Sequence, residues 1–285
     1  MPSLWMLAAS LLFACMGVCV KLGATRFAAA ELVFYRGFIS CLLVYAYVRG
    51  AGLSLASRHW RVHVRRSLSG FVSLVLYFYA ISLIPLATAV TLNYTSPLFV
   101  ALLVARQRRE KVRPAVFMAI AIGLLGVALL LQPTFSSEQT LGALFGLGSG
   151  IVASFAYVSV RRLGELGEPE WRTVFYFSLV ASLGGLPWAL ASAPVHRIEV
   201  GDALLLAGVG GFGAAAQLCM TRAYKQGRTV VAATLAYSTV IFASALGIWL
   251  WDERLPAIAW AGNALIVASG GLTSALSRAT PLEQD

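Results

Sequence analysis

Residues 80–100 read AISLIPLATAVTLNYTSPLFV, and residues 223–243 read AYKQGRTVVAATLAYSTVIFA. Six residues of these segments are identical at a constant offset of 143 positions, and at the same offset Glu110 corresponds to Glu253. We therefore interpret the chain as one unit that occurs twice. Because the repeated segment is strongly apolar, the duplication is typical of a membrane protein whose internal repeats frame a transport pathway.

The composition is that of a membrane protein. Hydrophobic residues make up 59% of the 285 residues and charged residues only 12%, with a mean hydropathy of +0.79, whereas soluble domains carry about 25% charged residues. Backbone polar groups find no water in hydrocarbon, so membrane spans are helices or closed barrels. The apolar runs are about 20 residues long rather than about ten residues of alternating pattern, so we predict an all-α polytopic protein.

Ten apolar stretches, each bounded by charges, Pro or Gly, predict ten transmembrane helices. In the first copy they cover residues 4–21, 30–48, 67–84, 86–105 and 114–131. In the second copy they cover residues 141–160, 171–191, 203–220, 229–251 and 255–277. We predict a first five-helix repeat over residues 1–138 and a second over residues 139–285, which includes a short cytoplasmic tail. No cleavable signal peptide is expected, because the N-terminus lacks a basic region before its apolar run.

Basic residues gather in alternate loops. The loops on one side hold 17 of the 22 Lys and Arg residues: Arg49, Arg58, Arg61, Arg65, Arg66, Arg106, Arg108, Arg109, Lys111, Arg113, Arg161, Arg162, Arg172, Arg222, Lys225, Arg228 and Arg278. This distribution explains the net charge of +10 as a topology signal rather than as a nucleic-acid surface, and it places both termini in the cytoplasm. Five spans per repeat is an odd number, so the second copy must enter the membrane from the opposite side, as an inverted repeat.

The sequence holds no pattern of an enzyme, a metal site or a cofactor site. A nucleotide-binding P-loop, an HExxH motif and a Ser/His/Asp arrangement are all absent, and His59, His63 and His196 fall in predicted loops. The four cysteines lie in apolar spans without accompanying His or carboxylate, so we interpret them as small packing residues: Cys15, Cys19, Cys41 and Cys219. We predict no catalytic residue, no bound metal and no cofactor.

Polar residues form stripes on two neighbouring spans of the first copy. Ser69, Ser73 and Tyr77 recur every fourth residue in the third span, and Asn93 and Tyr94 accompany a threonine stripe in the fourth. Small hydroxyls can simply bond to their own backbone or to a neighbouring helix. An Asn amide needs several partners in hydrocarbon and is harder to explain in this way.

The second copy supplies equivalent polar residues, and tyrosines near the span interiors suit a flat ligand, although Tyr is also common at the membrane interface. The predicted substrate-binding residues are Tyr77, Tyr79, Asn93, Tyr94, Tyr157, Gln217, Tyr237 and Ser238.

Two further residues are expected to have gating or structural roles. Pro97 frees a backbone carbonyl one turn earlier and weakens the fourth helix there. Arg36 enters the second span, where it can pair with Glu31, snorkel to the interface or bind a carboxylate; the first two are favoured. In the sixth span, Gly142, Gly146 and Gly150 form one face that predicts close helix approach.

The fourth-span pattern TLNYTSPLFVALL, residues 91–103, and its echo TLAYSTVIFASALGIWLWDERL, residues 234–255, resemble the EamA-type drug/metabolite transporter superfamily. Within it the chain looks most like the aromatic amino-acid exporters of the YddG type. The resemblance implies a basket-shaped bundle with a central cavity inside spans 1–4 and 6–9. It places Asn93, Tyr94 and Pro97 in the motif, with Tyr237 as the equivalent of Tyr94. Val240 replaces Pro97 in the second copy, so any helix break is expected to be asymmetric.

The predicted function is export of aromatic and other neutral amino acids and related small metabolites across the bacterial inner membrane by alternating access. The expected partners are a small-molecule substrate and the lipid bilayer, with no nucleic acid, and the expected state is a monomer. One alternative is an antiporter of phosphorylated sugars or nucleotide sugars, which requires midplane Lys or Arg and finds only Arg36 here. Another is an intramembrane enzyme or a non-transporting scaffold, although nucleophiles, acids and metal ligands at depth are lacking.

Overall fold

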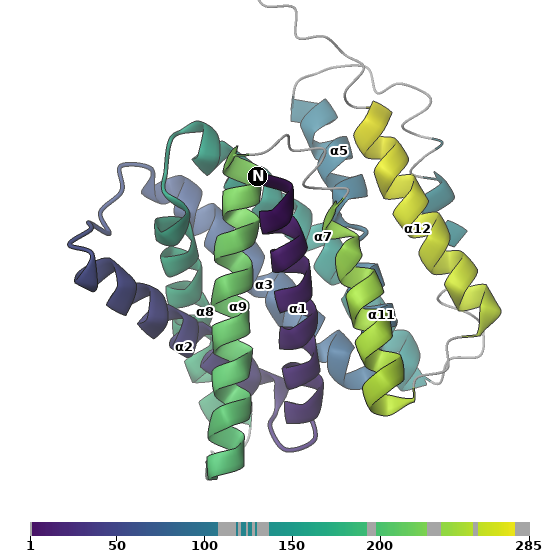
Figure 1. Ribbon diagram of the computed structural model, residues 1–285, viewed down its shortest axis with the longest axis horizontal. Coiled ribbons are helices and arrows are strands. Elements are labelled where there is room, and N and C mark those ends of the chain that lie inside the picture. Colours follow the sequence, from purple (N-terminus) through teal and green to yellow (C-terminus); the bar gives the residue numbers. More distant parts are fainter. Residues whose placement is uncertain are drawn as a thin grey trace, which may run out of the picture.

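The computed structural model describes residues 2–107, 137–192, 198–226, 235–252 and 256–276, together with 118, 121–123, 125–126 and 129. Within these residues every regular element is a helix, which confirms the predicted all-α class (Figure 1). The helices are α1 (Pro2–Gly23), α2 (Ala29–Gly50), α3 (Trp60–Leu83), α4 (Leu86–Asn93), α5 (Ser96–Gln107), α7 (Ser137–Glu165), α8 (Glu170–Ser192), α9 (Val200–Gln226), α11 (Ser238–Trp251) and α12 (Ala257–Leu276).

Six of the described helices, α1, α2, α3, α7, α8 and α9, are long and apolar enough to cross a membrane. The predicted fifth span, residues 114–131, lies outside the described residues except for single positions, as does the beginning of the ninth. The predicted count of ten therefore stays a prediction. α3 begins at Trp60, seven residues before the predicted start at residue 67, because its first two turns carry charged side chains that a hydropathy pattern does not assign to a span.

The fourth predicted span is broken into α4 and α5 at Tyr94 and Thr95. Pro97 has no N–H to donate to the carbonyl of Asn93. The Thr95 hydroxyl donates to the Leu92 carbonyl at 2.7 Å, which satisfies one of the carbonyls that the helix end leaves open.

The second copy breaks at the equivalent place, so the expected asymmetry of the break is wrong. Residues 235 and 236 are helical, Tyr237 is a turn residue, and α11 begins at Ser238. The Ser238 hydroxyl donates to the Leu235 carbonyl at 2.6 Å. This bond repeats the bond from Thr95 to Leu92 at the offset of 143 residues. A hydroxyl residue therefore accompanies the break in both copies, and Val240 in place of Pro97 does not prevent it.

Helix contacts between the two copies occur in equivalent pairs. α3 packs on α7 just as α1 packs on α9, and α2 contacts α9 just as α8 contacts α3. α2 crosses α8, so this pair of equivalent helices faces each other directly, and α4 of the first copy meets α11 of the second. At the α2–α8 crossing, a Cβ on Gly37 would lie 2.6 Å from the Ser182 backbone N, which is why this position is a glycine. The described helices thus pack as two related sets.

The two ends of the bundle are held by different groups. At one end, Arg26, between α1 and α2, lies 3.0 Å from Asp202 in the first turn of α9. At the other end, Lys225, in the last turn of α9, donates to the carbonyl of Glu168, between α7 and α8. Residues 202 and 225 are about 35 Å apart along a helix, so these two ends, the Arg26 end and the Glu168 end, lie on opposite sides of an apolar layer.

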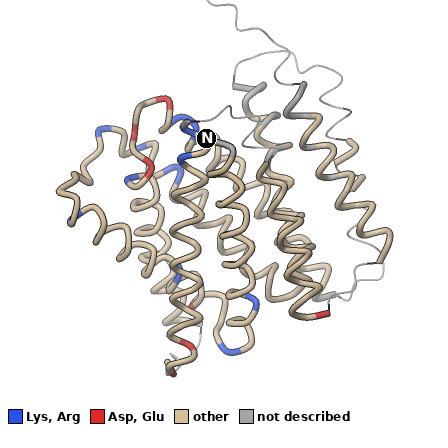
Figure 2. The backbone as a smooth tube through the Cα atoms, viewed as in Figure 1, with Lys and Arg blue, Asp and Glu red and all other residues tan. Residues whose placement is uncertain are grey.

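Most described Lys and Arg residues gather at the Glu168 end, near the marked N-terminus (Figure 2). There the Arg222 guanidinium lies 4.7 Å from the ring centroid of Trp5, which places the beginning of α1 at this end. At the Arg26 end, Arg26 contacts Glu199 and Asp202, and Lys21 Nζ lies 5.1 Å from the ring centroid of Trp251, the residue before Asp252. The charge asymmetry along the bundle axis follows the one predicted from alternate loops.

Candidate functional site

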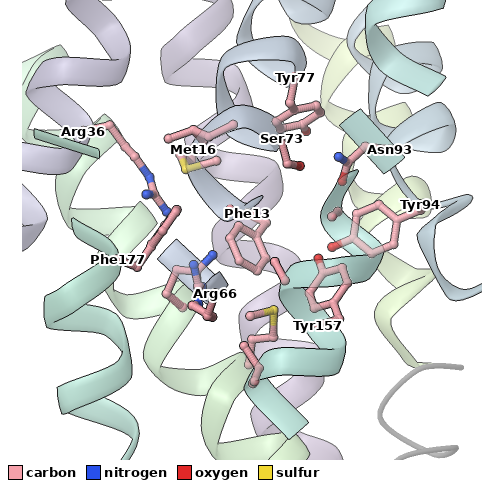
Figure 3. A pocket seen from close by; sticks show the side chains of 17 residues that line it. Phe13, Met16, Arg36, Arg66, Ser73, Tyr77, Asn93, Tyr94, Tyr157 and Phe177 are labelled. Carbon is pink, nitrogen blue, oxygen red and sulfur yellow. The ribbon is translucent and has the colours of Figure 1, made fainter. Parts of the chain in front are cut away.

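A cavity lies inside the bundle, where helices of both copies meet (Figure 3). Its empty volume is about 650 Å³, open space at its mouth included. α1, α2, α3, α4, α7, α8 and α9 all contribute to it. The lining residues are Phe13, Met16, Arg36, Arg66, Gly70, Ser73, Leu74, Tyr77, Asn93, Tyr94, Ala153, Ala156, Tyr157, Val160, Phe177, Gln217 and Met220.

The lining contains pairs of equivalent residues from the two copies. Val-Phe-Tyr at 33–35 recurs at 174–176, an offset of 141, so the next residues, Arg36 and Phe177, correspond. At the offset of 143, Tyr77 corresponds to Met220. All four of these residues line the cavity. The cavity therefore lies where equivalent parts of the two copies meet, which is where repeat transporters bind their substrates.

Two arginines reach this cavity around one phenyl ring. The guanidinium carbon of Arg36 lies 4.5 Å from the ring centroid of Phe177, and that of Arg66 lies 3.9 Å from it. Both side chains are buried, at 1% and 2% exposure. The nitrogens Nε and Nη1 of each arginine have no hydrogen-bond partner among the described residues. Figure 3 shows Arg36, Phe177 and Arg66 along one wall.

Two sequence predictions about these arginines are wrong. Arg36 neither snorkels nor pairs with Glu31: its side chain is buried in the cavity wall, and Glu31 Oε2 accepts a hydrogen bond from the Ala28 backbone N at 2.9 Å. Arg66 is not a loop residue, because it lies in the second turn of α3 and its Nη2 donates to Gln217 Oε1 at 2.8 Å.

A chain of polar groups forms another part of the wall and joins three helices. Asn93 Nδ2 donates to the Ser149 hydroxyl at 2.8 Å, and the Ser73 hydroxyl donates to the Ser149 carbonyl at 2.9 Å. Close approach of α7 makes these bonds possible, since a Cβ on Gly150 would lie 2.6 Å from Thr95 Oγ1 and 2.8 Å from the Leu92 carbonyl oxygen. The predicted close packing of the α7 glycine face is confirmed.

Tyr94 connects the cavity to the second copy. Its hydroxyl accepts a hydrogen bond from Thr239 Oγ1 at 2.8 Å, and its ring centroid lies 6.4 Å from that of Tyr237. Tyr237 itself is buried and does not line the cavity. These contacts bring the two helix breaks together, so the break regions of both copies meet directly behind the cavity wall.

The structure brings together five of the eight predicted substrate-binding residues. Tyr77, Asn93, Tyr94, Tyr157 and Gln217 line the cavity together with Arg36. Tyr79 points elsewhere, with its ring centroid 5.6 Å from those of Phe145 and Trp188. Tyr237 and Ser238 lie behind the wall, and the side chain of Pro97 is outside the described part of the chain.

Sequence reasoning missed Arg66, Phe177, Met16 and Ser149. A usable signal existed for Arg66, which precedes Ser73 by seven residues and therefore shares its helix face. Phe177 and Met16 carry no such signal, because an apolar residue in an apolar span does not reveal which way it points.

A second polar cluster, at the Glu168 end, corrects the assignment of His63 to a solvated loop. His63 is 1% exposed in the first turn of α3, and its Nε2 lies 3.4 Å from Glu168 Oε2. Ser57 and Arg172 donate hydrogen bonds to the Glu168 carboxylate. Although burial favours its neutral form, these donors and the neighbouring His63 lower the pKa of Glu168 below its usual value. The cluster ties the loop before α3 to the loop before α8.

The family model for EamA-like transporters matches residues 1–132 and, a second time, residues 140–275. The chain belongs to the EamA-like transporter family. A pseudopaline exporter of Pseudomonas aeruginosa is 34% identical to this EamA-like protein over 263 residues, which cover 92% of this chain and 91% of the relative. A riboflavin transporter of Vibrio cholerae is 25% identical over 274 residues, covering 94% and 90%.

A solved crystal structure resembles the EamA-like protein with a TM-score of 0.73 at 22% identity, covering 98% of this chain and 99% of that one. This likeness concerns the fold. An uncharacterized transporter of Helicobacter pylori is 29% identical over 272 residues. The protein is a multi-pass membrane transporter of the bacterial inner membrane and not an enzyme, as predicted. The narrower resemblance to aromatic amino-acid exporters stays a prediction.

Proposed function

We propose that the protein exports small organic metabolites, neutral amino acids among them, from the cytoplasm by alternating access, with the cavity as the substrate site. The observation that carries the proposal is the position of the cavity between equivalent helices of two copies, with aromatic and polar side chains along its wall. Tyr77, Tyr94 and Tyr157 offer flat surfaces, and Asn93 and Ser73 offer hydrogen-bonding groups.

The proposed architecture is ten helices in a 5+5 inverted repeat, divided at residues 138 and 139, with both termini in the cytoplasm. The offset segments and the exchange of helix contacts between copies support it. The basic Glu168 end supports a cytoplasmic position for the beginning of α1. We propose that this unit acts as a monomer.

Alternating access requires that each end of the passage can be closed. The described helices are joined at both ends, by Arg26 with Asp202 at one and by the Glu168 cluster with Lys225 at the other. Arg26 is half-exposed, and a partly exposed ion pair contributes only about 0–1 kcal/mol, so this end needs little free energy to open. The Glu168 cluster is buried and holds its end more firmly, because its charges lose their partners when it separates.

Flux through purified protein in liposomes tests this proposal. We expect saturable transport of at least one solute from a panel of Phe, Met, Thr and riboflavin, and acceleration of labelled solute uptake by unlabelled solute inside, as exchange through one alternating site requires. Liposomes without protein serve as the control for leakage. No saturable flux of any of these solutes would count against the proposal.

A second candidate, antiport of phosphorylated sugars or nucleotide sugars, gains support from Arg66. That function needs cationic groups at depth, and the sequence offers Arg36 alone, whereas the cavity holds two arginines. Exchange of labelled inorganic phosphate for sugar phosphate in the same liposomes distinguishes this function from amino-acid export.

A further inference from the structure

The arginines of the cavity have open hydrogen-bonding capacity. Arg66 uses Nη2 to bond to Gln217, but its Nε and Nη1 have no partner among the described residues. Nε and Nη1 of Arg36 have none there either. Buried donors in native proteins are nearly always paired. Open donors on a cavity wall therefore indicate a ligand that accepts from them.

Contact with Phe177 does not fill this capacity. A guanidinium over an aromatic ring interacts through its flat face, whereas its five N–H groups point outward in its own plane. Both arginines lie over the ring of Phe177. Phe177 therefore orients the two guanidinium groups and leaves their Nε and Nη1 donors available to a ligand.

The guanidinium groups of Arg36 and Arg66 are close enough together to bind the same small molecule. Their guanidinium carbons lie 4.5 Å and 3.9 Å from one ring centroid, so the carbons are at most 8.4 Å apart, the sum of these distances. No Asp or Glu is found among the described residues that line the cavity. The charge that balances these arginines must therefore come from outside the wall.

We infer that the cavity takes an organic dianion, whose two negative charges bind Arg36 and Arg66 and whose remainder packs against Tyr77, Tyr94 and Tyr157. This inference rests on the proposed function and specifies the substrate class of the same site. Carboxylate and phosphate both match the planar fork of arginine. A molecule with two carboxylates and one with a phosphate monoester are the two sources of such charge.

Ligand-induced thermal stabilisation of the purified protein tests the inference, because a ligand that binds only the folded state raises its melting temperature. N-benzoyl-glutamate and N-benzoyl-glutamine share one aromatic ring and differ in one negative charge. Phenyl phosphate and benzenesulfonate make the same comparison for phosphate. In at least one pair we expect the dianion to bind about tenfold more tightly, as one added charge-assisted contact implies. Equal affinities in both pairs, or no binding of any of the four, overturn the inference.

Substitutions locate the preference on the two arginines. Arg66→Gln and Arg36→Gln should each abolish the preference for the dianion. Arg65→Gln is the matched control, since it removes a neighbouring charge from the same helix turn but on its exposed face. Retention of the preference in both cavity variants, or its loss in Arg65→Gln, contradicts the inference. The comparison of dianion with monoanion in the unaltered protein needs no variant and stands even if one fails to fold.

Failure of this inference and failure of the proposed function look different. Saturable flux of neutral amino acids without any preference for dianions leaves export intact and removes the anion site. Tight binding of a dianion that depends on Arg36 and Arg66, without flux of any solute, keeps the site and removes transport.

Discussion

A buried arginine without a charged partner destabilises a helix bundle in lipid. Insertion scales give about 2.5–3.5 kcal/mol for one Arg at the centre of a span. Arg36, within α2, and Arg66, in the second turn of α3, both face the cavity here. Aromatic contact with Phe177 offsets about 0.5–2 kcal/mol for each. The hydrogen bond to Gln217 compensates Arg66 further. Nε and Nη1 of both arginines have no partner among the described residues, which is the expected pattern for residues held ready for a ligand.

Tyr94 offers a test of the cavity wall that spares the packing of the bundle. Tyr94→Phe removes the hydroxyl that accepts from Thr239 and leaves the ring in place, so we expect a loss of about 0.5–1.5 kcal/mol of stability and a several-fold lower transport rate. Thermal unfolding and initial flux rates measure the two effects. Tyr79→Phe, outside the cavity, is the control and should transport normally. Equal rates in both variants would remove Tyr94 from the site.

Single residues show how far sequence could predict this site. Asn93 was identifiable because an amide in an apolar span needs partners, and it has one in Ser149. Ser238 was a candidate on the same grounds, yet its hydroxyl bonds to its own backbone, as small hydroxyls often do. Arg66 was missed because hydropathy ends a span at its first charge, whereas α3 continues for two turns beyond it.

At the scale of helices, close packing of α7 against α4 positions the polar wall. Gly150 is the contact point, and any side chain there meets the Leu92 carbonyl oxygen and Thr95 Oγ1 within 3 Å. The helix break at Tyr94 and Thr95 turns these groups toward α7. The glycine pattern predicted the close approach, but the partner helix was not predictable, because such a face fits any smooth neighbour.

Gly150→Ala should therefore destabilise the protein. Overpacking of this kind costs about 1–3 kcal/mol, which exceeds the gain of up to about 1 kcal/mol from replacing Gly by Ala in a helix. Gly148→Ala is a matched control two residues away, since its Cβ meets Leu76 at an ordinary 3.6 Å. Thermal unfolding in detergent should show a lower midpoint for Gly150→Ala alone. A midpoint at or above the unaltered value would mean that α7 does not pack this closely.

For the whole molecule, duplication explains both the architecture and the site. Equivalent residues from the two copies meet in the cavity as unlike partners, Arg36 with Phe177 and Tyr77 with Met220. Two copies of one fold thus form a site that combines charged, aromatic and apolar side chains. The repeat was visible in the sequence because residues 80–100 and 223–243 keep the break motif. The shift of the offset from 143 to 141 hid the correspondence of the earlier helices.

Equivalent loops of the two copies lie at opposite ends of the bundle. Thr25 and Leu166 correspond at the offset of 141 and are both exposed turn residues. Thr25 is next to Arg26, which contacts the beginning of α9, and Leu166 is near Glu168, which contacts the end of α9. Inverted halves with the basic end in the cytoplasm therefore predict that these two positions face different compartments.

The most direct measurement is labelling of Thr25→Cys and Leu166→Cys, each in a background without Cys15, Cys19, Cys41 and Cys219, by a membrane-impermeant maleimide in spheroplasts. Thr25→Cys should react in intact spheroplasts, whereas Leu166→Cys should react only after permeabilisation. Reaction of both positions from the same side would contradict the inverted arrangement and, with it, the substrate passage between the halves.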